Sequence, residues 1–189
     1  MPQQSKVAVV VGSLRKESIN RKAALALARL APESLDLEQV EIGDLPLYDE
    51  DVEAAGAPAA WTRFREAIKG SDAVLFVTPE YNRSVPGGLK NAIDVGSRPY
   101  GQSAWAGKPT AIMSVSPGAI GGFGANHHLR QSLVFLDMPV MQQPEAYIGD
   151  GFHLFGEDGG IVKDGTEKFF SKFIDAFAEW IGRTAKPAS

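Results

Sequence analysis

The sequence predicts an α/β protein with a doubly wound, five-stranded parallel sheet. Five short runs rich in apolar and β-branched residues recur along the 189 residues, separated by longer stretches with helical spacing. Two of the runs, VAVVV and AVLFV, are almost continuously apolar, which is typical of strands covered by helices on both faces. Strands that alternate with helices in this way form parallel sheets through right-handed crossovers.

The expected elements follow in chain order. The strands are expected at 6–11, 35–42, 73–78, 110–115 and 139–142. Apolar stripes at helical spacing predict a helix after the first strand (Ile19, Ala23, Leu27, Leu30), one after the second (Trp61, Phe64, Ile68) and a last one from about Thr166 (Phe169, Phe173, Phe177, Ile181). We expect the final residues, TAKPAS, to be a frayed tail.

Two long connections stand out between these elements. They run from Gly43 to Pro58 and from Gly149 to Gly160. Both are long enough to be lids or subunit contacts, and ordinary surface loops explain them equally well.

The composition narrows the class of protein. A length of 189 residues suits a single domain, and 44% hydrophobic residues with a net charge of -4 are typical of a globular protein with no marked preference for nucleic acid or membrane surfaces. The absence of cysteine excludes disulfides, thiolate nucleophiles and iron-sulfur clusters. Any redox chemistry therefore needs a bound cofactor. The polar start MPQQSK and the lack of a long apolar run predict a cytoplasmic protein without a membrane segment.

Three loops are the candidate functional segments. In a doubly wound sheet, ligands bind outside the carboxyl ends of the strands, where the winding direction reverses. The segments that follow the first, third and fourth strands are GSLRKESIN (12–20), PEYNRSVPGGLKN (79–91) and SPGAIGG (116–122). They are also dense in glycine, proline, serine and asparagine, so the composition and the topological rule agree.

The first loop suits a compact dianion such as a terminal phosphate. It joins a strand to a helix, so backbone N–H groups converge at the helix start. Ser13, Ser18 and Asn20 add side-chain donors, and Arg15 adds a charge that can engage two phosphate oxygens. Ser18 could instead serve only as the helix cap. The loop lacks both the Gly-x-Gly-x-x-Gly spacing of dinucleotide folds and the Gly-Lys-Ser/Thr ending of triphosphate loops. Glu41, at the end of the second expected strand, could bind a ribose as in a dinucleotide fold, but without the glycines this is a weak signal.

The other two loops suit a flat heterocycle. Tyr81, between an acid and an amide, offers an aromatic face beside hydrogen-bonding groups, although it could simply cover the core. Gly118, Gly121 and Gly122 let the backbone approach a ligand and present N–H groups to a ring that becomes anionic on reduction, although a plain glycine turn is also possible.

Taken together, the three motifs resemble the NADPH-dependent FMN reductase family, in particular its chromate and quinone reductase branch. The similarity runs from about Lys6 to Ile148. It implies a flavodoxin-like sheet of order 2-1-3-4-5, one FMN-binding domain over 1–189, and a homodimer or homotetramer. The segment VGSRPYG (95–101) departs from the tryptophan-containing form expected at this place.

The resemblance also assigns the cofactor-binding residues. It implies that the FMN phosphate is held by Ser13, Arg15, Ser18 and Asn20, the isoalloxazine and ribityl chain by Pro79, Glu80, Tyr81 and Asn82, and the polar edge of the ring by Ser116, Pro117, Gly118 and Gly121.

The expected activity is hydride transfer from NADPH or NADH to FMN and on to a small-molecule acceptor such as a quinone, chromate or an azo compound. Because the cofactor carries this chemistry, no catalytic side chain is assigned. Arg15, Arg83 and Arg98 are candidates to attract an anionic acceptor. The neighbours His127 and His128 point about 100° apart on a helix, so no metal site is expected. The alternatives are a flavodoxin-type electron carrier and a sensor or scaffold that has lost turnover.

Overall fold

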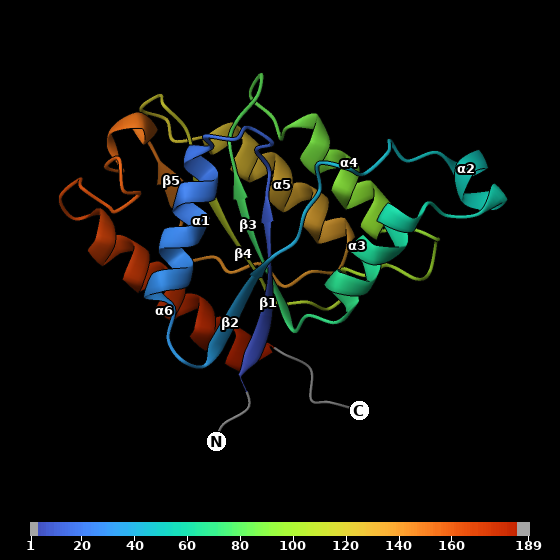
Figure 1. Cartoon of the computed structure of the whole chain (residues 1–189). Coiled ribbons are helices and arrows are strands. Elements are labelled where there is room, and N and C mark those ends of the chain that lie inside the picture. The colour runs from blue at the N-terminus through green and yellow to red at the C-terminus, as the bar shows by residue number, and fades with distance from the viewer. Residues whose placement is uncertain (1–3, 185–189) are drawn as a thin grey trace.

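The computed structural model describes residues 4–184, which form one parallel sheet with helices on both faces (Figure 1). The strands are β1 (Ser5–Val11), β2 (Leu35–Gln39), β3 (Ala73–Thr78), β4 (Thr110–Val115) and β5 (Ala146–Ile148). The helices are α1 (Ile19–Leu30), α2 (Glu50–Ala55), α3 (Ala59–Lys69), α4 (Gly87–Gly96), α5 (Phe123–Phe135) and α6 (Thr166–Thr184), with a short 3-10 turn at Gly151–His153.

The strand order is β2-β1-β3-β4-β5, and every neighbouring pair is parallel. The chain first crosses from β1 out to β2 and then returns past β1 to β3, so the winding direction reverses between β1 and β3. The predicted fold class and strand order are therefore confirmed.

Two apolar cores lie on the two faces of this sheet. Alternate strand residues such as Val9 and Leu75 face α1 and α6, where Phe173 and Phe177 are buried. The residues between them, such as Phe76, face α3, α4 and α5. Burial on both faces explains why these strands are continuously apolar in sequence.

One predicted strand is wrong. Pro139–Gln142 was expected to be the fifth strand, but Val140 forms only a single bridge to Thr110. Pro139 has no N–H to donate, and its carbonyl accepts bonds from the Thr110 N–H at 3.0 Å and the Trp180 Nε1 at 2.9 Å. The strand forms further along the chain, where Ala146–Ile148 pairs with the end of β4.

The connection from Gly43 to Pro58 contains a helix that was not predicted, α2, which projects from the body of the molecule (Figure 1). Asp49 caps it by accepting a bond from the Asp51 N–H at 2.8 Å. Glu53 ties it to α3 through an ion pair with Arg65 at 2.5 Å. The Arg65 side chain also donates to the Val95 carbonyl at 2.8 Å and stacks over Trp61, so the projecting helix is fixed to the core.

Among the helices within residues 4–184, none is long and apolar enough to span a bilayer.

Candidate flavin-binding site

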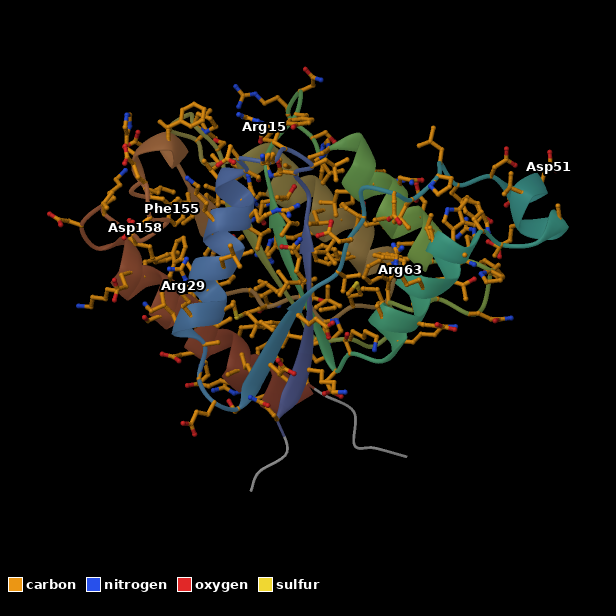
Figure 2. The ribbon with its side chains drawn as sticks, in the orientation of Figure 1. Arg15, Arg29, Asp51, Arg63, Phe155 and Asp158 are labelled. Carbon is orange, nitrogen blue, oxygen red and sulfur yellow. The ribbon has the colours of Figure 1, made fainter. Side chains whose placement is uncertain are left out.

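The three candidate loops meet at one edge of the sheet. They follow β1, β3 and β4, which are neighbours in the sheet and parallel, so their carboxyl ends lie together. Figure 2 shows Arg15 at this end of the molecule, beside the tip of the loop that follows β3. The place agrees with the general rule that ligands bind where the winding direction reverses.

Close packing sets the path of the first loop. An added methyl group at Gly12 would lie 2.7 Å from the Thr78 Oγ1, so only glycine lets β1 pass the end of β3 at this point. The Gly12 N–H still pairs with the Val77 carbonyl at 2.9 Å. The chain then leaves the sheet with Ser13 buried and Arg15 exposed.

The start of α1 supplies the strongest donors. Ser18 caps the helix by accepting a bond from the Arg21 N–H at 3.3 Å, and its carbonyl accepts from the Lys22 N–H at 3.0 Å. A helix provides no acceptor for its first N–H groups, so those of Ile19 and Asn20 remain for a ligand, reinforced by the helix dipole. The cap and the anion site are therefore compatible roles for Ser18.

The structure gives Asn20 a different chemistry from the one predicted. Its side chain is 1% exposed, and its Nδ2 donates to the Val115 carbonyl at 3.2 Å, which ties this loop to the end of β4. Its Oδ1 is buried without a partner. An acceptor cannot bond to a phosphate oxygen, which is also an acceptor. The side chain of Asn20 therefore suits a ligand hydroxyl or N–H, and only its backbone suits a phosphate.

The second loop is a tight hairpin. The backbones of Tyr81 and Ser84 pair with each other, and Asn82 and Arg83 between them have φ angles of 51° and 63°. Tyr81 is 48% exposed, so its ring is available to a ligand. The carboxylate of Glu80 is only 12% exposed and accepts bonds from the Ala125 N–H and the Arg83 side chain. The side chain of Glu80 is thus engaged within the protein.

The third loop is exposed only in part. Pro117 and Gly118 lie on the surface, and the nearest heavy atom to an added methyl group at Gly118 is 4.0 Å away. Gly121 differs, because a methyl group there would lie 2.4 Å from the Tyr147 backbone. Its N–H donates to the Gly118 carbonyl at 3.2 Å. Gly121 is therefore explained by packing against β5, whereas Gly118 is open to a ligand.

A hollow of about 320 Å³ joins the first two loops. It is lined by Gly12, Leu14, Arg15, Tyr81, Pro86, Gly87 and Gly88. Its walls are mostly apolar, and phosphate donors lie beside them in the same loop as Leu14. This combination fits a flat aromatic ring that carries a phosphate arm, as in FMN.

Five of the lining residues were not predicted as site residues, namely Gly12, Leu14, Pro86, Gly87 and Gly88. The signal for the last three was the VPGG sequence, in which proline precedes two glycines at the start of α4. Leu14 had no signal of its own, because an exposed leucine is common on protein surfaces.

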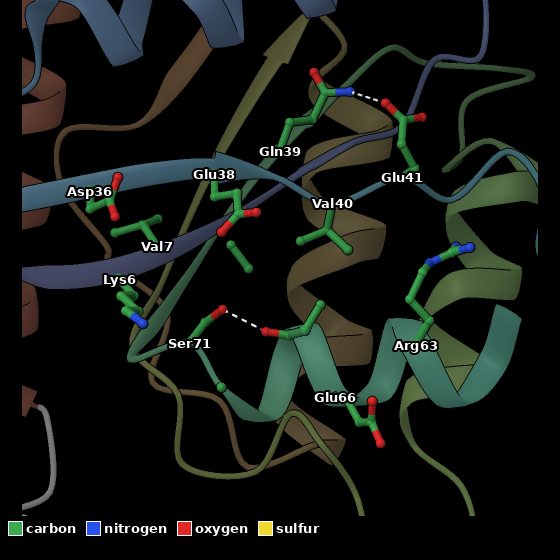
Figure 3. Close-up of a pocket in the computed structure, with 13 residues that line it drawn as sticks. Lys6, Val7, Asp36, Glu38, Gln39, Val40, Glu41, Arg63, Glu66 and Ser71 are labelled. Carbon is green, nitrogen blue, oxygen red and sulfur yellow. Dashed lines mark hydrogen bonds between the residues drawn. The ribbon is translucent and has the colours of Figure 1, made fainter. Parts of the chain in front are cut away.

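A second hollow, of about 430 Å³, lies away from these loops (Figure 3). It lies between β2 and α3 and is lined by charged side chains that include Asp36, Glu38, Arg63 and Glu66. Glu41 lines it and accepts a bond from Gln39 at 2.7 Å. Nothing in this arrangement favours a ribose at Glu41.

The remaining cationic and histidine candidates are dispersed. Arg83 pairs with Glu80 at the hairpin, whereas Arg98 stacks over the Tyr48 ring at 5.9 Å, beyond the end of α4. His127 bonds to the Tyr147 hydroxyl and His128 to the Ser84 hydroxyl, each at 2.9 Å. No group of three or more metal-binding side chains occurs in the part of the chain that the structure describes.

Comparison with known proteins identifies the family. The model of the NADPH-dependent FMN reductase family matches residues 5–153. A quinone reductase from Pseudomonas putida is 72% identical over 181 residues, which cover 96% of this chain and 97% of that protein. A 2-hydroxy-1,4-benzoquinone reductase from Burkholderia sp is 48% identical over 93% of this chain and 96% of that protein.

A solved structure agrees with the sequence comparisons. FerB from Paracoccus denitrificans, a flavoenzyme NAD(P)H:(acceptor) oxidoreductase, has a TM-score of 0.90 and 45% identity, and the match covers 96% of this chain and 100% of that one. The predicted enzyme class, the FMN cofactor and the NAD(P)H co-substrate are confirmed at the level of the family. These relationships, together with the matching fold, establish that the chain belongs to the NADPH-dependent FMN reductase family.

Proposed function

We propose that this protein is an NAD(P)H-dependent quinone reductase that works through FMN bound at the three loops. The observation that carries the proposal is the apolar hollow between the first loop, the hairpin after β3 and the start of α4, which places Arg15, a donor for a phosphate, beside a surface for a flat ring. The quinone is supported by the P. putida relative, which has that activity in its name and is 72% identical to this chain.

The phosphate is assigned to the first loop. Its ligands are the hydroxyls of Ser13 and Ser18, the guanidinium of Arg15 and the backbone N–H of Asn20. The Asn20 Oδ1, which is buried and has no partner within the protein, is assigned to a hydroxyl of the ribityl chain. A ligand donor there would relieve the cost of a buried unpaired acceptor, about 1–3 kcal/mol.

The ring is assigned to the other two loops. Tyr81 offers its face, Pro79, Glu80 and Asn82 contribute through the backbone of the hairpin, and Gly118 lets the chain approach the polar edge of the ring. Ser116, Pro117 and Gly121 shape that edge. The Ser116 Oγ donates to the Gly118 carbonyl at 3.2 Å, and the Ser114 Oγ donates to the Gly121 carbonyl at 2.7 Å, so the turn is held from within.

When bound, FMN supplies the redox chemistry: it takes hydride from a nicotinamide and gives electrons to an acceptor. The task of the protein is to hold the ring with one face accessible and to direct backbone N–H groups at its polar edge. Arg83 lies at the same end of the sheet with 71% of its side chain exposed, and its charge favours anionic co-substrates and acceptors near this face. Chromate, an anion, is therefore proposed as a further acceptor, and azo compounds are proposed from the resemblance to the family.

The proposed setting is the cytoplasm, with the protein as a homodimer or homotetramer. A partner surface is supported by Val134 and Phe135, which lie on α5 with 75% and 81% of their area exposed. Light scattering during size-exclusion chromatography tests the assembly, and a monomer at micromolar concentration would contradict it.

An anaerobic spectrophotometric experiment tests the activity. We expect the purified protein, reconstituted with FMN, to lose its visible absorption on addition of NADPH and to regain it on addition of a quinone. A flavin that is bound but reduced by neither NADPH nor NADH would point to a flavodoxin-type electron carrier instead. A protein that fails to bind FMN at all would refute the assignment of the three loops.

A further inference from the structure

The hairpin after β3 has a backbone conformation that needs support from its surroundings. The Tyr81 N–H donates to the Ser84 carbonyl at 3.0 Å, and the Ser84 N–H donates to the Tyr81 carbonyl at 2.9 Å. The two residues between them, Asn82 and Arg83, both have positive φ angles, which define a type I′ turn. Asparagine tolerates this region, but arginine does not favour it, so neighbouring contacts must stabilise the turn.

Glu80 provides such contacts at the base of the hairpin. Its Oε2 accepts a bond from the Ala125 N–H at 3.0 Å, and its Oε1 accepts one from the Arg83 Nη1 at 3.3 Å. α5 follows Gly122, which has no side chain to cap the helix. Glu80 therefore acts as the cap from a different loop, and its negative charge is favourable at the start of a helix.

A second observation shows how closely the hairpin and α5 approach each other. An added methyl group at Gly124 would lie 2.8 Å from the Arg83 carbonyl oxygen and 2.9 Å from the Glu80 Oε2. The first turn of α5 can therefore meet the hairpin only if it carries glycine at this position. One turn further along α5, His128 bonds to the Ser84 hydroxyl at 2.9 Å. The hairpin is thus seated on α5 at two successive turns.

We propose that Glu80 is a positioning residue, whose carboxylate fixes the hairpin on α5 so that Tyr81 is held at the hollow proposed to bind the ring. The inference rests on the proposed function and deepens it. Both carboxylate oxygens are engaged within the protein, so Glu80 acts on the flavin through the hairpin. If a smaller fraction of the molecules has the hairpin packed on α5, the apparent flavin affinity falls by the same factor.

The position of Glu80 predicts which part of the flavin is affected. The phosphate is assigned to the loop after β1, whereas Glu80 supports the loop assigned to the ring. Loss of the carboxylate should therefore weaken binding of FMN and of riboflavin, which lacks the phosphate, by the same factor. A variant at the phosphate site should instead weaken FMN alone.

Binding of both flavins to the apoprotein, followed by fluorescence quenching, tests this role. For Glu80→Ala we expect both dissociation constants to rise about tenfold, the lower end of the range for a hydrogen bond to a charged group. Glu80→Gln should lie between Glu80→Ala and wild type, because the amide keeps an acceptor for the Ala125 N–H. Gly124→Ala, which crowds the contact between α5 and the hairpin from the helix side, should also raise both dissociation constants.

Glu179→Gln is the matched control. Glu179 forms an exposed ion pair with Arg183 on α6 at 3.2 Å, away from the candidate loops, so its removal should leave flavin affinity unchanged. The visible spectrum of bound FMN reports the surroundings of the ring, and it should shift in Glu80→Ala but not in Glu179→Gln.

Distinct results would overturn the inference. One is unchanged flavin affinity and an unchanged spectrum in Glu80→Ala with only a lower melting temperature, because Glu80 would then be purely structural. Another is a loss for FMN much larger than that for riboflavin. If Glu80→Ala does not fold, Glu80→Gln and Gly124→Ala decide by the same criteria. A wild-type protein that binds neither flavin would refute the proposed function itself, which is a separate failure.

Discussion

Arg15→Ala tests the phosphate assignment directly. Arg15 is exposed in the loop between β1 and α1, and its guanidinium is proposed to bond to the FMN phosphate. A hydrogen bond to a charged group contributes about 1.5–3 kcal/mol. Solvent and salt screen an exposed arginine, so we expect the lower part of that range, a rise in the FMN dissociation constant of roughly 10- to 30-fold.

The assay compares two flavins and two arginines. Titration of the apoprotein with FMN should show the loss, and titration with riboflavin should show none, because riboflavin has no phosphate. Arg29→Ala is the matched control: Arg29 is also exposed, but it lies in the last turn of α1, far from Arg15 (Figure 2). An unchanged FMN dissociation constant in Arg15→Ala, or an equal loss for riboflavin, would refute the assignment.

Two further predictions concern stability. Gly12→Ala places a methyl group 2.7 Å from the Thr78 Oγ1, so it should destabilise the apoprotein by about 1–3 kcal/mol. Gly118→Ala has 4.0 Å of space, so its stability should stay within about 0.5 kcal/mol of wild type. Equal urea midpoints for the two variants would contradict this prediction. Arg65 lowers the pKa of Glu53 below its ordinary 4.5, chiefly through their hydrogen bond, so the pair contributes stability above that pH and loses it as the pH falls through the lowered pKa. Glu53→Gln should therefore cost about 1.5–3 kcal/mol at neutral pH and converge with wild type in acid, and a difference in stability that is independent of pH would show that the charge is not the cause.

The fold could be predicted from the sequence because its elements carry local signals. Continuous apolar runs predict strands that are buried on both faces, and glycine-rich segments predict the loops between strands and helices. The second strand ends at Gln39, three residues earlier than expected. The two larger errors, the fifth strand and α2, have physical reasons. Pro139–Gln142 is apolar enough for a strand, but its pairing is set by contacts with Thr110 and Trp180, which are distant in sequence. α2 has a clear cap at Asp49 but fully buries none of its residues, so it lacks an apolar stripe.

The sequence could predict which loops meet at this edge of the sheet, but not what their individual side chains bond to. Residue types and loop positions identified the three loops, because anion binding and ring packing need donors and glycines at the strand ends. What individual side chains bond to depends on contacts between loops. Glu80 bonds to Ala125, 45 positions away, and Asn20 bonds to Val115, 95 positions away. No local pattern reports such pairings, so an acid in a ligand-binding loop and an acid that caps another helix look the same in sequence.

The two halves of the site are built differently, and this difference bears on function. The half proposed to hold the phosphate includes the start of α1, whose Ala23 and Leu27 are buried in the core, so we expect its donors to be fixed before a ligand arrives. The half proposed to hold the ring includes a hairpin with two positive φ angles, which the carboxylate of Glu80 ties to α5. Substitutions in the first half should change how tightly a phosphorylated flavin is held. Substitutions in the second should change how the ring is oriented, and thus the rate at which a nicotinamide or a quinone exchanges electrons with it, because hydride transfer depends on alignment as well as on occupancy.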